Sequence, residues 1–270
     1  MNVEKKNILV TGAGSGIGRE IVLALLKKGA HVAAVDIHES TLKDLKESLG
    51  KKSKNITTHV ADISNKVAVE KLPKEVIAAQ GSIDGIINVA GIIQPFVKIN
   101  DLGYDAIERV MNINFYGTLY MVKAFLPELL KRPEAHIVNV SSMGGFLPVP
   151  GQSIYGASKA AVKLLTEGLY SELKDTNVHV SVVFPGATAT NISKNSGVAE
   201  PADAANDSAA QNFPMLQPSE VAKIVIDGME KNKLQIFTGK DSRMMNLLYR
   251  LSPVYATNMI AKQMRSLLNK

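Results

Sequence analysis

The chain contains no cysteine and no tryptophan, and aromatic residues make up only 5% of its 270 residues. Without cysteine, disulfide bonds, thiolate nucleophiles and cysteine-ligated metals are all excluded. The five histidines, at positions 31, 38, 59, 136 and 179, are scattered and form no pair at the spacing of a metal-binding helix. We therefore expect neither thiol chemistry nor a metal site.

Long hydrophobic runs are missing as well. No apolar segment approaches the roughly 20 residues of a membrane-spanning helix. Residues 1–6 pass directly into a short apolar run, without the hydrophobic region of a signal peptide. We therefore expect a cytoplasmic protein. With 46% hydrophobic residues, the chain can bury one large core, so a single domain is expected.

Acidic residues are nearly absent from one part of the chain. Residues 231–270 carry eight Lys or Arg and a single Asp, whereas residues 1–230 carry 23 basic and 24 acidic residues. The net charge of +6 therefore belongs to the C-terminal tail, and the rest of the chain is close to neutral. A neutral body gives no support for binding nucleic acid.

Seven short apolar runs alternate with helical patterns, at residues 7–11, 31–35, 56–60, 83–90, 135–141, 178–184 and 234–238. Strands that alternate with helices predict a parallel sheet with helices on both faces. The expected fold is α/β, a Rossmann-type doubly wound sheet of seven parallel strands. Such sheets bind ligands beyond the carboxyl ends of their strands.

A glycine-rich turn, Thr11-Gly-Ala-Gly-Ser-Gly-Ile-Gly18, follows the first run and leads into a helical pattern marked by Ile21 and Leu25. Glycines allow the pyrophosphate of a dinucleotide to approach the N–H groups at the positive end of a helix. A plain flexible turn is the alternative. Against it, the second run ends in Asp36, whose carboxylate can hold the ribose hydroxyls of NAD.

Tyr155 and Lys159 are four positions apart, so a helix places the phenol and the ammonium on one face. A nearby cation stabilises a phenolate, and the pair can therefore act as a catalytic acid and base. By itself the pair also fits a half-buried tyrosine beneath an extended lysine.

Together these motifs resemble the short-chain dehydrogenase/reductase family, in the branch with a TGxxxGxG turn and a YxxxK pair. The resemblance covers roughly residues 5–240. Its other motifs are Asn88-Val-Ala-Gly91, Asn114, Ser142 at thirteen positions before Tyr155, and Pro185-Gly-Ala-Thr-Ala-Thr190. One departure is Val89, which stands where the family usually has a second Asn.

The resemblance implies reversible hydride transfer between an alcohol and a nicotinamide cofactor. Tyr155 would be the general acid/base, and Lys159 together with the positive nicotinamide would lower its pKa. Ser142 would bond the substrate oxygen, with Ser141 as its competitor for that role. Asn114 would position a water that relays protons to Lys159. The implied catalytic residues are Asn114, Ser142, Tyr155 and Lys159.

The implied cofactor contacts are Gly12, Ser15, Gly16, Ile17, Gly18, Asp36, Asp62, Ile63, Asn88, Ala90, Gly91, Tyr155, Lys159, Pro185, Gly186, Thr188 and Thr190. Thr190 is favoured over Thr188 for the nicotinamide carboxamide, and a helix N-cap is the alternative role of Asp62. Asp36 is followed by Ile37 rather than an Arg, which predicts NAD over NADP. Arg19 is the nearest cation that could soften this preference.

We therefore expect an NAD(H)-dependent oxidoreductase that interconverts a secondary alcohol and a ketone on a small apolar substrate. Apolar residues after the fourth strand and after Ser142, at 93, 96, 143, 146 and 149, predict the apolar pocket. The alternatives are an NADP(H)-dependent carbonyl or 3-oxoacyl reductase, a nucleotide-sensing regulator without catalysis, and an isomerase, epimerase or dehydratase with a tightly held cofactor.

The expected catalytic domain spans residues 1–240. Within it, residues 187–217 have little periodicity, which is typical of a substrate lid or of a disordered surface excursion; Phe213, Met215 and Leu216 favour the lid. Residues 241–270 form a basic amphipathic helical extension. The extension could pack on the body or on a neighbouring subunit, form a wall for a lipid-like substrate, or contact a membrane peripherally.

The segments 104–131 and 153–175 resemble the helix pair through which members of the family form dimers and tetramers. We expect a symmetric homo-oligomer, with a tetramer favoured over a dimer.

Overall fold

The computed structural model describes residues 1–199 and 215–264. One sheet of seven parallel strands has the order β3-β2-β1-β4-β5-β6-β7, so the order reverses between β1 and β4. The strands are β1 (Asn7–Thr11), β2 (His31–Asp36), β3 (Ile56–Val60), β4 (Gly85–Asn88), β5 (Ala135–Val140), β6 (Val178–Pro185) and β7 (Gln235–Thr238). The predicted doubly wound fold is confirmed.

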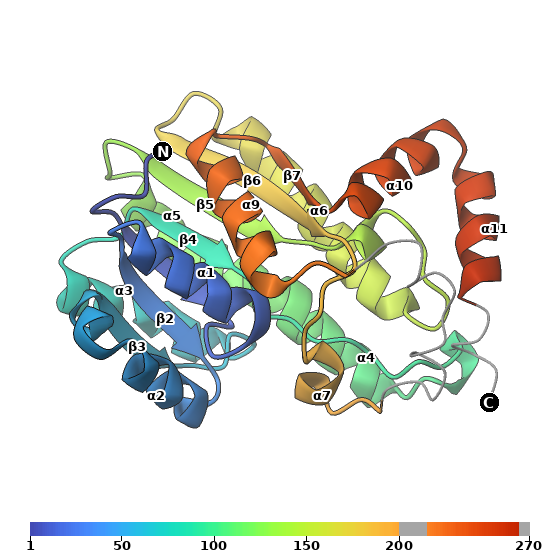
Figure 1. Cartoon of the computed structure of the whole chain (residues 1–270), viewed down its shortest axis with the longest axis horizontal. Helices are drawn as coiled ribbons and strands as arrows, with labels where there is room; N and C mark the ends of the chain where they lie inside the picture. The colour runs from blue at the N-terminus through green and yellow to red at the C-terminus, as the bar shows by residue number, and fades with distance from the viewer. Residues whose placement is uncertain (200–214, 265–270) are drawn as a thin grey trace.

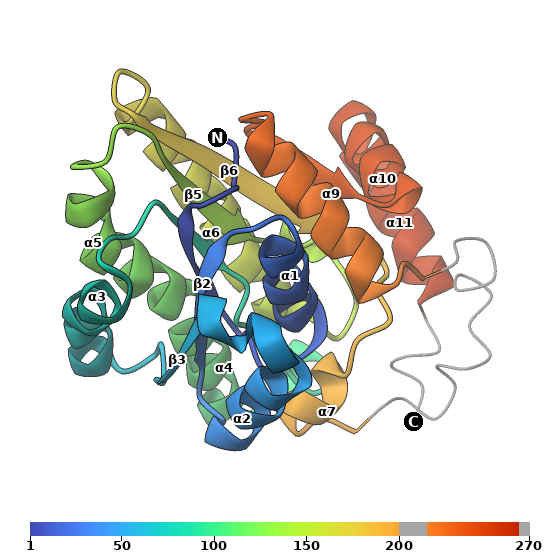
Figure 2. The same ribbon diagram turned by 60° about the vertical axis from the view of Figure 1, so that its left-hand side comes forward.

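Helices cover both faces of the sheet: α1, α2 and α9 lie on one face, and α3, α4, α5 and α6 on the other (Figures 1 and 2). The helices are α1 (Gly16–Lys27), α2 (Glu39–Ser48), α3 (Lys66–Gln80), α4 (Tyr104–Met111), α5 (Thr118–Leu129), α6 (Ser153–Glu172), α7 (Ile192–Ser196), α9 (Pro218–Glu230), α10 (Lys240–Leu251) and α11 (Pro253–Gln263). Three short 3₁₀ helices are η1 (Gly50–Asn55), η2 (Ile99–Asp101) and η4 (Met143–Gly145), and η3 (Asn112–Gly117) is a short π-helical segment.

Each face of the sheet has its own apolar core, because successive strand residues point to opposite faces. Ile8 packs with α1 and α9 in one core, whereas Leu9 packs with α3 and α5 in the other. Both side chains are fully buried. Burial on both faces explains why the strands read as continuous apolar runs in the sequence.

Strand β4 is shorter than the predicted run of residues 83–90. The N–H groups of Val89 and Ala90 both donate to the side chain of Thr11, at 3.0 and 3.2 Å from Oγ1, rather than to the backbone of a neighbouring strand. The chain therefore turns over the end of β1. A Cβ built on Gly12 would lie 3.0 Å from Ala90 Cα, which shows how closely the two loops approach.

The C-terminal tail forms two helices, α10 and α11, which are separated by Ser252. Pro253 begins α11, a position at which proline is favoured. Met245, Ala256 and Ile260 are buried against Leu147 in a third, smaller apolar core. No helix of the described residues is both long and apolar enough to cross a membrane.

The first turn of α10 is bonded to the body of the molecule. Ser242 Oγ donates to the carbonyl of Phe184 at 2.9 Å, and the N–H of Ala187 donates to Asp241 Oδ2 at 2.8 Å. A side chain on Gly186 would overlap the Asp241 carboxylate. The tail is therefore fixed to the end of β6 by its first helical turn.

His136 in β5 is fully buried, with Nε2 2.8 Å from Ser181 Oγ and with no partner for Nδ1 among the described residues. Burial, with smaller effects of His179 and the N-terminal ammonium, lowers its pKa from 6.5 to about 3. Below pH 6.5 the unfolded chain binds a proton that the folded chain does not. The contribution of neutral His136 to the free energy of unfolding is therefore fully present above pH 6.5 and is lost as the pH falls toward 3.

We expect His136 alone to remove about 2 kcal/mol from the free energy of unfolding between pH 6.5 and pH 5. His136→Gln should flatten this part of the pH profile, measured by urea unfolding at several pH values. His38→Gln, at an exposed position, is the control and should keep the wild-type slope. Equal slopes for His136→Gln and the wild type would contradict the prediction.

Candidate active site

Tyr155 and Lys159 lie one turn apart near the start of α6, and Lys159 Nζ is 6.0 Å from the centroid of the Tyr155 ring. The ammonium is buried and donates a hydrogen bond of 3.0 Å to the carbonyl of Val140, at the end of β5. Burial lowers the pKa of Lys159 from 10.5 to about 8. Lys159 therefore still carries most of its charge at pH 7.

Burial raises the pKa of Tyr155 above its ordinary value of 10.0, and a hydrogen bond with Ser142 lowers it by less. We predicted that Lys159 and a positive nicotinamide together lower this pKa. In the protein alone, desolvation of the phenolate is the larger effect. The free protein therefore holds Tyr155 as a protonated phenol at neutral pH.

Ser141 and Ser142 have different surroundings. Ser141 is buried, and its Oγ donates to the carbonyl of Lys159 at 2.7 Å. Ser142 Oγ accepts the N–H of Gly144 at 3.0 Å. A Cβ on Gly144 would lie 3.4 Å from Tyr155 Cε1 and 3.5 Å from Ser142 Oγ. Ser142 is thus the serine beside the phenol, whereas Ser141 fixes the backbone of α6.

Asn114 lies in η3, a π-helical segment between α4 and α5, and such wide turns are frequent at functional sites. Its fully buried amide bonds the backbone N–H and carbonyl of Ile92, at 2.8 and 2.9 Å, and Ser158 Oγ at 2.9 Å. A Cβ on Gly91 would lie 3.1 Å from both Asn114 Oδ1 and Lys159 Nζ. Asn114 and Lys159 therefore meet at Gly91.

The glycine turn joins β1 to α1 and requires glycine at three points. Gly12 and Gly16 have φ angles of 66° and 52°, which side chains disfavour. A Cβ on Gly18 would overlap the carbonyl of Gly12. The turn therefore brings backbone to the start of α1, where the first N–H groups of a helix have no intrahelical acceptors. This geometry fits an anionic pyrophosphate.

Asp36 ends β2 beside the glycine turn. Its Oδ2 accepts the N–H of Gly14 at 2.9 Å, and its Oδ1 accepts the N–H of His38 at 3.0 Å. Each oxygen keeps capacity for another donor, as a ribose hydroxyl would require. Ile37 is largely exposed, and Arg19 extends to Ser48 Oγ on α2, at 3.2 Å.

The segment after β6 passes over the glycine turn. Thr190 Cγ2 lies 3.7 Å from a Cβ built on Gly16, and Asn195 Nδ2 donates to Ser15 Oγ at 2.9 Å. Thr188 Oγ1 instead donates to the carbonyl of Gly186. Thr190, rather than Thr188, therefore approaches the glycine turn with its side chain.

The predicted lid is described only in part. Its two ends pair with each other, because Leu216 exchanges backbone hydrogen bonds with Ala187 and Ala189. Between them, α7 follows at Ile192–Ser196. Residues 200–214, including Phe213, lie outside the described residues.

Three of the predicted cofactor residues are engaged elsewhere by their side chains. Asn88 is buried, and its Nδ2 donates to Asn139 Oδ1 on β5 at 2.8 Å. Ile63 is buried beside Gly117. Asp62 Oδ1 accepts the N–H and the hydroxyl of Ser64, whereas the N-cap of α3 is Asn65. Asn88 Oδ1 has no hydrogen-bond partner among the described residues.

Gln94 is a residue of the site that the sequence did not reveal. Its fully buried side chain accepts the N–H groups of Ile154 and Tyr155, at 2.8 and 3.0 Å, and donates to the carbonyl of Gly151 at 2.9 Å. The loop after β4 therefore satisfies the first N–H groups of α6. Gln94 sits in an irregular loop, and no periodicity marks it.

Residues 6–201 match the family model described as short chain dehydrogenase. An uncharacterised oxidoreductase of Staphylococcus epidermidis is 34% identical over 221 residues, covering 81% of this chain and 94% of the relative. SadH of Mycobacterium tuberculosis, provisionally described as an oxidoreductase, is 32% identical over 257 residues, covering 92% of this chain and 91% of the relative.

Two solved structures show the same fold over nearly the whole chain. A short chain dehydrogenase/reductase of Burkholderia phymatum, in complex with NAD, is 26% identical with a TM-score of 0.84, covering 94% of this chain and 96% of its own. A short chain dehydrogenase of Burkholderia cenocepacia, in complex with NADP, is 26% identical with a TM-score of 0.80, covering 96% and 99%. The similarity therefore indicates a nicotinamide cofactor without selecting between the two.

We expect Gln94→Leu to lower the free energy of unfolding by about 1 to 3 kcal/mol, because two N–H groups at the start of α6 lose their acceptor. Hydrogen exchange at the amides of Ile154 and Tyr155 should become faster. Gln80→Leu, which removes a partly buried amide at the end of α3, is the matched control and should leave exchange in α6 unchanged. Wild-type exchange rates at both amides in Gln94→Leu would show that Gln94 does not hold this helix.

Proposed function

The chain belongs to the short-chain dehydrogenase family, and we propose that it transfers a hydride between NAD(H) and the carbinol carbon of an apolar secondary alcohol or ketone. As a member of this family it is a nicotinamide-dependent oxidoreductase that acts on CH–OH groups. The observation that carries the proposal is the convergence of Tyr155, Lys159, Ser142 and Asn114 beside the glycine turn, at the carboxyl ends of the strands.

The cofactor would lie across the point where the strand order reverses, between β1 and β4. The glycine turn would surround its pyrophosphate, Thr190 would bond the nicotinamide carboxamide, and Asp36 would accept hydrogen bonds from the adenosine ribose. Lys159 would hold the ribose next to the nicotinamide. When bound, the oxidised cofactor would supply the hydride acceptor and a positive charge that favours the phenolate of Tyr155.

Tyr155 would move the proton that accompanies the hydride. In the direction of reduction, its protonated phenol donates to the carbonyl oxygen, which agrees with the raised pKa in the free protein. In the direction of oxidation, the phenol would first lose its proton to water, and the charge of Lys159 favours this loss. The phenolate would then take the proton of the alcohol hydroxyl as the hydride leaves the carbinol carbon. Ser142 would donate its hydroxyl to the substrate oxygen as negative charge develops there.

Asn114 would have a positioning role in this mechanism. Its amide fixes the loop after β4 against α6 and brings Gly91 close to Lys159 Nζ. Its own backbone carbonyl accepts the hydroxyl of Thr118 at 2.8 Å. Asn114 would also position a water that relays protons to Lys159.

The third apolar core supports the proposal that the substrate is apolar. Met143 and Phe146, which follow Ser142, pack in it with residues of α10 and α11, including Met245 and Ile260. The tail helices therefore form the wall behind the Ser142 loop. In this proposal residues 1–240 are the catalytic domain, residues 187–217 its lid, and residues 241–270 the extension that completes the wall.

We propose a homo-oligomer, with a tetramer favoured over a dimer. Tyr116, Leu164 and Tyr170, in η3 and α6, are large apolar residues that are at least 40% exposed within one subunit. A second copy would cover this surface from water, which supports an interface there.

Tyr155→Phe should abolish turnover while NADH still binds, because only the ionisable hydroxyl is removed. Stopped-time assays of alcohol oxidation and fluorescence titration of NADH would measure the two properties. Tyr104→Phe, at an exposed position, is the control and should keep wild-type turnover. If Tyr155→Phe retains more than about a tenth of kcat, the activation free energy has risen by less than about 1.4 kcal/mol, and Tyr155 is not the acid/base.

The wild-type enzyme should prefer NAD over NADP on the order of a hundredfold or more in kcat/KM, because Asp36 would repel the 2′-phosphate. The double variant Asp36→Ala with Ile37→Arg should reverse the preference and leave the dependence on Tyr155 unchanged. Asp44→Ala, on the exposed side of α2, is the control for loss of an acidic residue. Equal or better use of NADP by the wild type would instead support the NADP(H)-dependent carbonyl or 3-oxoacyl reductase.

A further inference from the structure

The tail helices expose a set of large apolar side chains, here called the tail face. On α10 they recur every three or four residues, so they share one side of the helix. They continue at the start of α11. Each is between 46% and 76% exposed: Met244, Leu247, Leu251, Val254 and Tyr255.

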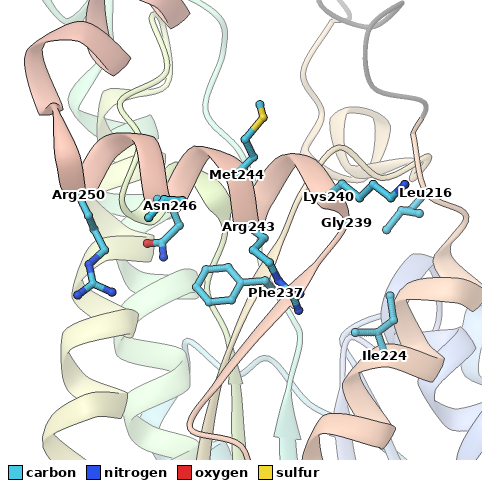
Figure 3. A pocket seen from close by; sticks show the side chains of 10 residues that line it. Leu216, Ile224, Phe237, Gly239, Lys240, Arg243, Met244, Asn246 and Arg250 are labelled. Atoms are coloured by element: carbon cyan, nitrogen blue, oxygen red, sulfur yellow. The ribbon is translucent and has the colours of Figure 1, made fainter.

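Cations border this apolar stripe. Lys240, Arg243 and Arg250 are exposed on α10 and, with Met244 and Leu247, line a groove of about 870 Å³ between β7, α9 and α10. Arg243 and Arg250 stand four residues before and three residues after Leu247, so they lie beside it on the helix surface. Figure 3 shows both pointing away from Met244, so they flank the stripe along its Leu247 edge. Apolar side chains with guanidinium groups along their edge are typical of a helix that lies in the interface of a bilayer.

The tail face carries no exposed acidic side chain. Within residues 240–264 the single acidic residue is Asp241, whose buried carboxylate accepts the N–H of Ala187. A two-fold contact of the tail face with itself would bring the same cations together, which disfavours a second copy as the partner. An anionic partner with an apolar layer beneath its charges matches both parts of the face.

We propose that the tail face docks on the surface of an anionic lipid bilayer. Met244, Leu247 and Leu251 would enter the boundary between headgroups and acyl chains, and the cations beside them would meet lipid phosphates. The opposite side of the same helices packs on the Ser142 loop through Met245 and Ile260. Docking therefore needs no change in how the tail packs on the body. The inference does not depend on the identity of the substrate.

The full-length chain should co-sediment with vesicles of phosphatidylcholine and phosphatidylglycerol, and at least tenfold less with vesicles of phosphatidylcholine alone. Binding should fall when the salt concentration is raised. Arg243→Glu with Arg250→Glu should reduce binding to the anionic vesicles at least tenfold. Leu247→Ser with Leu251→Ser should reduce it severalfold at unchanged net charge, which separates insertion of apolar side chains from attraction alone.

The matched control is Lys71→Glu with Lys74→Glu, on exposed positions of α3 at the other end of the molecule (Figure 1). It makes the same change in net charge and should bind nearly as the wild type. Each variant is first required to keep the wild-type unfolding midpoint. Equal loss in the α3 variant, equal binding to both kinds of vesicle, or no binding would each overturn the proposal. So would a loss of oligomer mass in light scattering that is specific to the α10 variants, since the face would then join two copies.

Discussion

Two hydrogen bonds accepted by Thr11 join the end of β1 to the loop after β4, and the geometry of the site depends on this junction. Its buried hydroxyl takes the N–H groups of Val89 and Ala90 where the order of the strands reverses. The loop after β4 is thereby drawn over the glycine turn. Gly91 then lies close enough to Asn114 and Lys159 that a side chain there would press on both. One hydroxyl thus sets the distance between the glycine turn and the proposed catalytic groups.

The start of α6 is held by buried polar groups rather than by apolar packing. Gln94 accepts two of its N–H groups, Asn114 bonds Ser158, and Ser141 bonds the carbonyl of Lys159. Such groups are costly to bury unless their hydrogen bonds are made, so they favour one arrangement of the helix over near alternatives. That selectivity suits the role proposed for Tyr155, because proton transfer tolerates little error in position.

The sequence predicted the seven strands because most are short apolar runs, as is typical of parallel strands buried on both faces. The edge strands β3 and β7 are only partly buried. It also predicted which residues follow the strands, since the topology alone brings those positions to one edge. It did not predict Gln94, Asn195 or Asp241. Each is a single polar residue whose partner lies far along the chain, and neither composition nor periodicity identifies such a pair. For the tail, the spacing of apolar residues predicted helices, but not the buried bonds that join α10 to β6.

Those bonds make the tail part of the site rather than an appendage. Asp241 occupies space that exists only because residues 186 and 239 are glycine, and it holds the N–H of Ala187, at the start of the segment that leads to Thr190. The same two helices pack on the loop that carries Ser142. The turn after β6 and the loop after β5 therefore share one support. A contact on the exposed side of α10 would therefore act on a helix whose first turn is bonded to the end of β6, next to the proposed cofactor site.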